Sequence, residues 1–254
     1  MKKRGEKKLG EVKVIKKEIE RVSTGILELD KITKGGFIDG STNLIVGGTG
    51  SGKSILALQF LIDGMKRGEN CLYVAFEERK EDFYNNALSL GWNLFNWEKK
   101  GKFHFLQYTP EKVRTMLEEG GGIVETIVLT KNIKRIVIDS VTSFELLFEE
   151  DTKKRAAVLM LFNMLSKWNL TSLLTYERDP VIDKKITSRA LEFESDSIIY
   201  LYLLRIKNRR ERFLEVLKMR GTNHSNNVYP LRLSKGGFKI SLKPFSGKFS
   251  YRLL

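Results

Sequence analysis

The sequence is poor in cysteine, in proline and in long apolar runs. Its 254 residues include 1 cysteine and 4 prolines. The lone cysteine, Cys71, cannot form an internal disulfide, which argues against a disulfide-held extracellular scaffold and favours a cytoplasmic protein. The apolar runs near Ile55–Ile62 and Ile198–Leu204 are too short to cross a bilayer. The N-terminus is rich in Lys and Glu and has no apolar stretch, so neither a membrane span nor a signal peptide is expected.

Acidic residues are scarce in the last third of the chain. The net charge is +14, and residues 197–254 contain 13 Lys and Arg against 2 acids, Glu211 and Glu215, a local excess of 11. Such a basic surface favours polyanions, which include nucleotide phosphates, nucleic acid and acidic proteins. Charge that only keeps the protein soluble is an equally good explanation, and both interpretations stay open.

Composition and length favour one α/β domain. The hydrophobic content of 41% is that of a globular protein, and the length allows a substantial core. Residues 1–20 are charged and have few bulky side chains, so we expect a solvated arm or a short edge strand there. One domain is expected over residues 21–254.

Short apolar runs alternate with helical patterns after residue 21. The runs do not alternate between apolar and polar residues, which is typical of strands buried on both faces of a parallel sheet. These runs are Asn43–Val46, Cys71–Phe76, Arg135–Ile138 and Ser172–Thr175. Helical patterns follow at Ile55–Met65 and Ala157–Trp168. This alternation predicts right-handed βαβ crossovers and a doubly wound, mostly parallel sheet.

The C-terminal third has strands with no long helix between them. The strand candidates are Ser197–Leu204, Phe213–Met219 and Phe238–Ile240. We expect them to extend the main sheet in antiparallel fashion. A triplet of glycines at residues 120–122 interrupts the helical stretch Glu111–Thr130, and a helix break or loop is expected there.

The strongest motif is the glycine-rich stretch Gly47-Gly48-Thr49-Gly50-Ser51-Gly52-Lys53-Ser54. It matches the phosphate-loop pattern G-x-x-x-x-G-K-[ST] completely, between an apolar strand and an amphipathic helix. Glycines let backbone N–H groups wrap around phosphate oxygens, and the helix N-terminus favours negative charge. We therefore expect this stretch to bind ATP or ADP, with Lys53 on the β- and γ-phosphates and Ser54 on Mg²⁺.

Two acidic motifs follow strands that should end beside the phosphate loop. The run Arg135–Ile138 is followed by Asp139, which we expect near Mg²⁺, through a water molecule. The run Cys71–Phe76 is followed by Glu77 and Glu78, and a carboxylate there can hold the attacking water. An isolated acidic pair more often flanks the next helix, so the residues alone leave the role of Glu77 and Glu78 open.

At four places the sequence resembles a KaiC-type ATPase domain of the RecA superfamily. The matching blocks are Arg21–Asp30 with Gly35-Gly36 and the phosphate loop, Tyr73–Glu78, Ile138–Thr142 and Glu215–His224. The resemblance covers about Val22 to Ile240. The block Lys218–His224 is the most specific, because generic RecA-like ATPases lack it.

The resemblance implies a RecA-like P-loop NTPase that hydrolyses ATP in a ring, typically a homohexamer, with ATP at subunit boundaries. Glu77 and Glu78 match the family's catalytic glutamate pair. Lys218 and Arg220 match basic fingers that reach the γ-phosphate of the neighbouring subunit, where the planar fork of Arg can bind two phosphate oxygens. His224 matches a position near the nucleotide.

Two departures from the circadian clock protein of that family limit the analogy. That protein carries two such domains in tandem, whereas this chain has one. Its second domain carries adjacent Ser and Thr phosphorylation sites, and the comparable stretch here, Glu192–Asp196, resembles the first, purely hydrolytic domain. We therefore expect neither autokinase activity nor a clock role, and we take Thr187 and Ser188 for ordinary loop residues.

Three functions fit these features. The first is an oligomeric ATPase that signals its nucleotide state to a partner protein. The second is a recombinase-like DNA-binding ATPase, which would explain the basic C-terminal third, although a separate N-terminal DNA-binding domain is lacking. The third is a non-catalytic nucleotide-binding regulator, against which the acidic pair and the basic fingers argue.

Two further features point less strongly to a role. The strand expected beside Asp139 leads to Thr175, Glu177 and Arg178. Two interpretations of Glu177 stay open: it is a γ-phosphate sensor, or it is only a charge that flanks a helix. The basic loop Arg178–Ala190 either touches DNA in a ring pore or is solvated.

Overall fold

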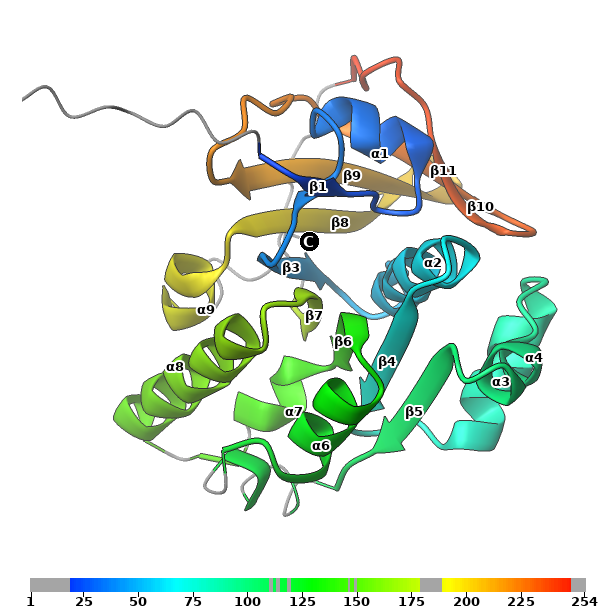
Figure 1. Cartoon of the computed structure of the whole chain (residues 1–254). Coiled ribbons are helices and arrows are strands. Elements are labelled where there is room, and N and C mark those ends of the chain that lie inside the picture. The colour runs from blue at the N-terminus through cyan, green and yellow to red at the C-terminus, as the bar shows by residue number, and fades with distance from the viewer. Residues whose placement is uncertain are drawn as a thin grey trace, which may run out of the picture.

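One sheet organises the chain. Its strands are β3 (Thr42–Gly47), β4 (Asn70–Ala75), β5 (Phe103–Gln107), β6 (Ile133–Asp139), β7 (Thr171–Glu177), β8 (Ser197–Ile206), β9 (Arg209–Met219), β10 (Tyr229–Ser234) and β11 (Gly237–Ile240). Within the residues that the structure describes, these 9 strands lie in the order β11-β10-β9-β8-β3-β7-β6-β4-β5 (Figure 1). Before these strands in the sequence, β1 (Arg21–Val22) and β2 (Phe37–Ile38) form a separate antiparallel pair.

The computed structural model describes residues 19–247, except residues 110–111, 113–114, 118–119, 146, 149 and 179–188. Most of the expected arm over residues 1–20 lies outside this range. So does most of the basic loop Arg178–Ala190, including Thr187 and Ser188.

The central strands are parallel, as the sequence predicts. β3 pairs in parallel with both β7 and β8, and β4 pairs in parallel with β5 and β6. Every residue of β3 is buried, which explains why the apolar runs do not alternate. The four predicted strands correspond to β3, β4, β6 and β7.

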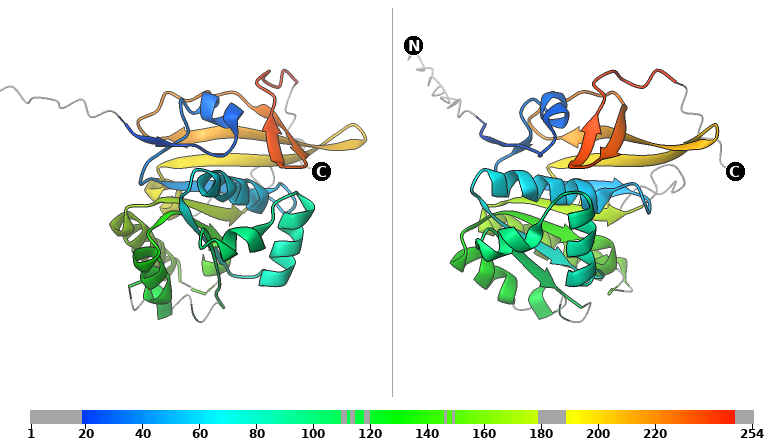
Figure 2. Two further views of the ribbon diagram at one scale, coloured as in Figure 1. Left: turned by 45° about the vertical axis from the view of Figure 1, so that its right-hand side comes forward. Right: turned by 90° about the vertical axis from the view of Figure 1, so that its right-hand side faces the viewer.

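Helices cover both faces of the sheet (Figure 2). On one face lie α1 (Leu27–Ile32), α2 (Lys53–Lys66), α3 (Lys80–Ser89) and α4 (Leu94–Lys99), whose apolar residues share a core with Ile45 and Tyr73. On the other face lie α6 (Gly122–Thr130), α7 (Val141–Glu145), α8 (Asp151–Trp168) and α9 (Arg189–Glu194), packed around Leu44 and Leu72. The fold is therefore the expected doubly wound sheet, and α6 begins at the expected glycine break.

The C-terminal extension is antiparallel from β9 onward. β9 pairs with β8, β10 with β9 and β11 with β10, all in antiparallel fashion. The expectation needs one correction, because β8 itself runs parallel to β3 and belongs to the parallel part. Strand β10 is not predicted from the sequence, because Pro230 lacks the backbone N–H that a strand residue donates and is therefore unusual within a strand.

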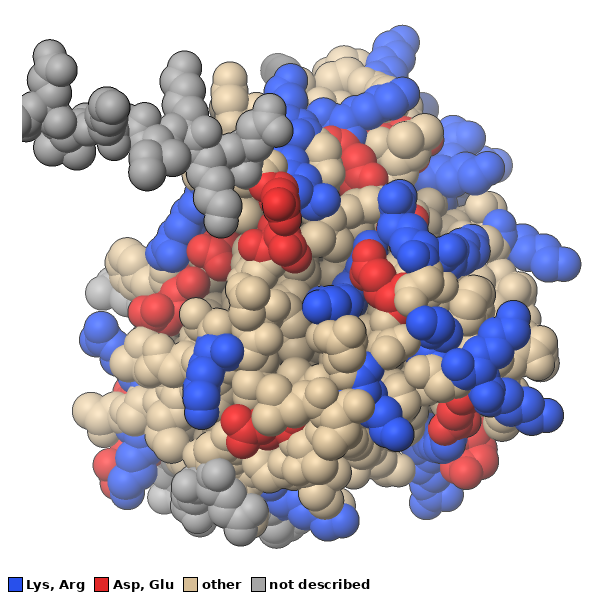
Figure 3. Space-filling view, viewed as in Figure 1, with Lys and Arg blue, Asp and Glu red and all other residues tan. Residues whose placement is uncertain are grey.

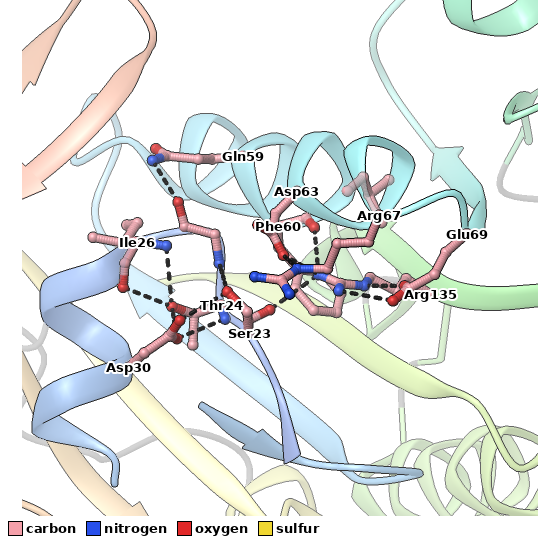
Figure 4. Close-up of polar contacts among 12 residues, drawn as sticks. Ser23, Thr24, Ile26, Asp30, Gln59, Phe60, Asp63, Arg67, Glu69 and Arg135 are labelled. Atoms are coloured by element: carbon pink, nitrogen blue, oxygen red, sulfur yellow. Dashed lines mark hydrogen bonds and ion pairs between the residues drawn. The ribbon is translucent and has the colours of Figure 1, made fainter. Parts of the chain in front are cut away.

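Arg135 links the parallel sheet to α2 and to the residue that follows β1 (Figure 4). Its side chain is 1% exposed. Nε donates to Glu69 at 2.5 Å, and Nη1 donates to Asp63 at 3.2 Å and to the carbonyls of Phe60 and Ser23 at 2.9 and 3.0 Å. Such contacts compensate the cost of burying a guanidinium, and they cross-link segments far apart in the sequence.

Replacement of Arg135 with Ala is expected to lower the free energy of unfolding by about 3–5 kcal/mol, measured by urea denaturation. The loss removes the guanidinium from Glu69, from Asp63, which keeps Arg67, and from the carbonyls of Phe60 and Ser23. Arg67→Ala is the matched control, because Arg67 also binds Asp63, at 2.8 Å, but is 57% exposed. It should cost less than about 1 kcal/mol. Equal losses for the two variants would show that the buried network does not stabilise the fold.

Candidate active site

The phosphate loop joins the end of β3 to the start of α2. Gly50 and Gly52 have φ angles of +78° and +105°, a region that side chains other than glycine rarely adopt. A Cβ at Gly52 would also collide with the ring of Phe238. Gly52 is the N-cap of α2, and no side chain caps this helix. The first amide groups of α2 are therefore available to an anion.

A cavity of ≈ 430 Å³ opens beside this loop. Its lining brings together most of the residues that the sequence singled out: Thr49, Gly50, Gly52, Lys53, Ser54, Glu77, Glu78, Asp139 and Glu177. They meet because the carboxyl ends of parallel strands lie at one edge of the sheet, where open α/β folds bind ligands. The cavity therefore combines a phosphate loop with several carboxylates.

Lys53 lies buried in this cavity next to a carboxylate. Its Nζ is 3.3 Å from the carbonyl oxygen of Gly48 and 3.6 Å from Glu177. Thr49 Oγ1 donates a hydrogen bond to the same glutamate. A phosphate that binds to Lys53 would compete with Glu177 for the ammonium group, so Glu177 is placed where it can respond to an anion.

Asp139 is held by hydroxyl groups from two neighbouring strands. Tyr73 donates to Oδ2 at 2.5 Å, and Thr175 Oγ1 donates to Oδ1. Burial, and then the charge of Asp139, raise the pKa of Tyr73 well above its ordinary value, so Tyr73 stays a neutral donor. Ser54 lines the same cavity. A hydroxyl and a carboxylate are oxygen ligands that suit Mg²⁺, which keeps several waters.

Glu77 and Glu78 differ in their surroundings. Glu77 is exposed and accepts a hydrogen bond from Ser143 Oγ. Glu78 is partly buried and accepts one from Asn86 Nδ2 at 2.8 Å. Burial raises the pKa of Glu78, although the Asn86 contact opposes this shift. A raised pKa makes the ionised carboxylate a stronger base, which suits the activation of water.

Lys218 and Arg220 lie away from this cavity in the same chain. β9 pairs Lys218 with Ile198, near the start of β8, whereas Arg212 on the same strand lines the cavity. Six residues of extended strand separate Arg212 from Lys218 by about 20 Å. Lys218 Nζ donates to the carbonyls of Glu192 and Ser195 at 2.7 Å each.

The end of β9 carries an exposed charge next to an exposed aromatic ring. Arg220 is 53% exposed and lies 3.4 Å from Asp196. Phe193, whose carbonyl accepts from Arg220, is 68% exposed. Burial, and then the charge of Arg220, lower the pKa of Lys218. The phosphate loop of the same chain does not reach this surface, because it lies at the other end of β8.

His224 lines a different cavity, of ≈ 360 Å³, together with Lys31, Lys34 and Tyr229. Its Nδ1 is 3.0 Å from the carbonyl oxygen of Ser225. The structure therefore does not bring His224 to the phosphate loop of its own chain.

Sequence reasoning missed Arg212 and Tyr73. Nε and Nη2 of Arg212 donate to the carbonyl of Gly50 at 3.2 and 2.9 Å, so a second cation borders the loop. The apolar run that contains Tyr73 indicates only core packing, and no residue near Arg212 in the sequence links it to the loop.

A further cavity of ≈ 390 Å³ lies next to the first and shares Ser54, Ile55 and Glu78 with it. The rest of its lining is largely apolar and includes Leu58, Phe83 and Leu90.

A family model for the KaiC ATPase matches residues 22–244. The chain belongs to the KaiC ATPase family. Curated members include the circadian clock protein KaiC3 of Synechocystis, which is 30% identical over 87% of this chain but only 46% of its own length. A UPF0273 protein of Thermotoga maritima is 34% identical over 87% of this chain and 96% of its own length.

The KaiC match extends to the fold. The crystal structure of a KaiC-like protein from Pyrococcus horikoshii is 33% identical, with a TM-score of 0.79, and the match covers 88% of this chain and 99% of that one. The chain thus has the RecA-like fold of single-domain KaiC-like proteins, and it spans about half the length of the clock protein KaiC3. Membership in this ATPase family implies a nucleotide site. In the described part of the chain, no helix is long and apolar enough to cross a membrane.

Proposed function

We propose that this chain is an ATPase that hydrolyses Mg·ATP at the cavity beside Gly47–Ser54. The observation that carries the proposal is the convergence of a buried lysine, an uncapped helix N-terminus and carboxylates from neighbouring strands on one cavity. Lys53 and the amides of the loop would bind the β- and γ-phosphates. The partly apolar cavity next to Ser54 and Ile55 offers room for the nucleoside.

Catalysis would divide between two kinds of residue. Ser54 and Asp139 would hold Mg²⁺, which supplies positive charge to the β- and γ-phosphates when it is bound. Glu78, with Glu77 beside it, would orient and deprotonate the attacking water. Arg212 would hold the loop through Gly50 and add a second positive charge near the phosphates. Glu177 would leave Lys53 when the γ-phosphate arrives, which makes it a sensor of nucleotide state.

The active site would be completed by a second copy of the chain. Lys218 and Arg220 cannot reach the cavity of their own subunit, so their role as fingers requires a neighbour. A ring, for which a hexamer is proposed by analogy with the family, would place them on the next phosphate loop, with His224 near the same nucleotide. Release of Glu177 would then signal the nucleotide state to a partner protein.

One assay tests this proposal. Purified protein should hydrolyse ATP in the presence of Mg²⁺, lose that activity when EDTA removes the metal, and form an oligomer with nucleotide, as sized by light scattering. The metal dependence follows from the hard oxygen ligands that Ser54 and Asp139 offer. Protein that stays monomeric and shows no affinity for Mg·ATP would contradict the proposal. Tight binding without turnover would instead support a non-catalytic regulator.

A further inference from the structure

Two hairpin turns project from the edge of the sheet at the phosphate-loop end. β3 pairs with β8 as far as Leu201, and residues 202–206 of β8 continue beyond it with β9. β10 pairs Leu231 with Arg212 and runs on to its own turn at residues 235–236. Both turns therefore lie at the end of the sheet that carries the nucleotide cavity. Figure 2 shows the β8–β9 turn extending past the body of the molecule.

These turns form a basic patch, which we define by the exposed side chains Arg205, Lys207, Arg209, Arg210, Arg232 and Lys235. Glu211 is the one acid in the sequence between residues 205 and 212, and residues 230–247 contain none. Within the described residues, no ion pair neutralises any of the six. On the face in Figure 3, Lys and Arg gather along the edge formed by β10 and β11.

The register of the β8–β9 hairpin places like charges together. Arg205 lies directly opposite Arg210 in the antiparallel pair, and Ile206 lies opposite Arg209. Like charges in directly opposed positions destabilise a hairpin. An anion that binds between the two guanidinium groups would remove this repulsion. The arrangement therefore favours a negatively charged partner over a role in folding alone.

The composition of the patch distinguishes between two kinds of anionic partner. Protein interfaces depend on a buried apolar centre, often aromatic, inside a polar rim. Among the described residues 205–212 and 230–240, the one exposed large apolar side chain is Leu233, at 37% exposure. Nucleic-acid interfaces are far more basic, and the planar fork of Arg matches phosphate oxygens. The observations favour nucleic acid.

We propose that the basic patch binds the sugar-phosphate backbone of nucleic acid, without base specificity, at the end of the sheet that carries the phosphate-loop cavity. No aromatic residue in the patch offers a base-stacking platform, so affinity comes from phosphate contacts and falls steeply with salt. This binding is independent of ATP hydrolysis and goes beyond the proposed function.

Fluorescence anisotropy with labelled DNA, as single strand and as duplex, tests the proposal over a series of salt concentrations. The double variant Arg209→Glu/Arg210→Glu should bind DNA at least about tenfold more weakly, and the slope of log K against log salt should become shallower by about 1.5. The matched control, Lys131→Glu/Lys134→Glu, makes the same change in net charge at two exposed positions at the opposite end of the sheet. Its DNA binding should stay within about twofold of wild type.

Three outcomes would overturn the proposal. One is wild-type protein that does not bind DNA at low salt. Another is equal loss in the two double variants, which would mean that net charge alone attracts DNA. The third is equally tight, equally variant-sensitive binding of a labelled poly-glutamate peptide, which would assign the patch to an acidic protein partner. Circular dichroism of both variants shows whether weaker binding comes from lost structure.

Discussion

Replacement of Lys53 with Ala is expected to lower the rate of ATP hydrolysis by about 10²–10³-fold and to weaken nucleotide binding. Lys53 is 7% exposed and is the single lysine that lines the phosphate-loop cavity in the described part of the chain. Its charge is already desolvated before the nucleotide arrives, so its attraction for the γ-phosphate is weakly screened. Steady-state hydrolysis and calorimetric titration with ATP measure the two effects separately.

Lys66→Ala is the control for this variant. Lys66 lies on the same helix, α2, but is exposed at its far end, so hydrolysis should stay near the wild-type rate. The fold should survive Lys53→Ala, because the change removes a buried charge whose acidic partner, Glu177, is half exposed and can be solvated. A folded Lys53→Ala variant with full activity would refute the assignment of the phosphate loop.

The phosphate loop and the central sheet could be predicted because their signals are local. Gly50 and Gly52 must be glycine for their own backbone angles, and each residue of β3 is buried by helices on both faces. An apolar run ending in Asp139 therefore indicates both a buried strand and the edge where ligands bind. Periodicity and turn chemistry therefore indicate the buried strands and the phosphate loop even when the order of the strands in the sheet is unknown.

The rest of the site depends on contacts between distant segments. Arg212 reaches Gly50 only because β9 is paired in one register with β8, and 162 residues separate the two in the chain. The partners of Arg135 likewise come from two segments distant from it in the chain, Ser23 near the first strand and residues 60–69 at the end of α2. A charged residue inside an apolar run signals burial but not its partners. Lys218 and Arg220 are candidate site residues only through the resemblance to the KaiC family, because no pattern in the sequence around them indicates a role in binding phosphate.

Replacement of Arg220 with Ala is expected to slow hydrolysis by about 10³-fold while nucleotide binding changes little. The proposed finger acts on charge that develops at the γ-phosphate in the transition state, so kcat should fall far more than affinity. Arg232→Ala, which removes an exposed Arg from β10, is the control and should keep hydrolysis near the wild-type rate. Normal turnover by Arg220→Ala would exclude a finger role for this residue.

Mixing two inactive variants distinguishes a finger that acts in trans from one that acts within its own subunit. Lys53→Ala lacks a working phosphate loop but keeps Arg220, whereas Arg220→Ala keeps the loop. If the two are mixed as monomers before a ring forms, about one interface in four combines an intact loop with an intact finger. Hydrolysis should then return to about a quarter of the wild-type rate. No recovery in a mixed oligomer would mean that both residues must belong to one subunit, although the strand pairing places Arg220 and the phosphate loop at opposite ends of the sheet.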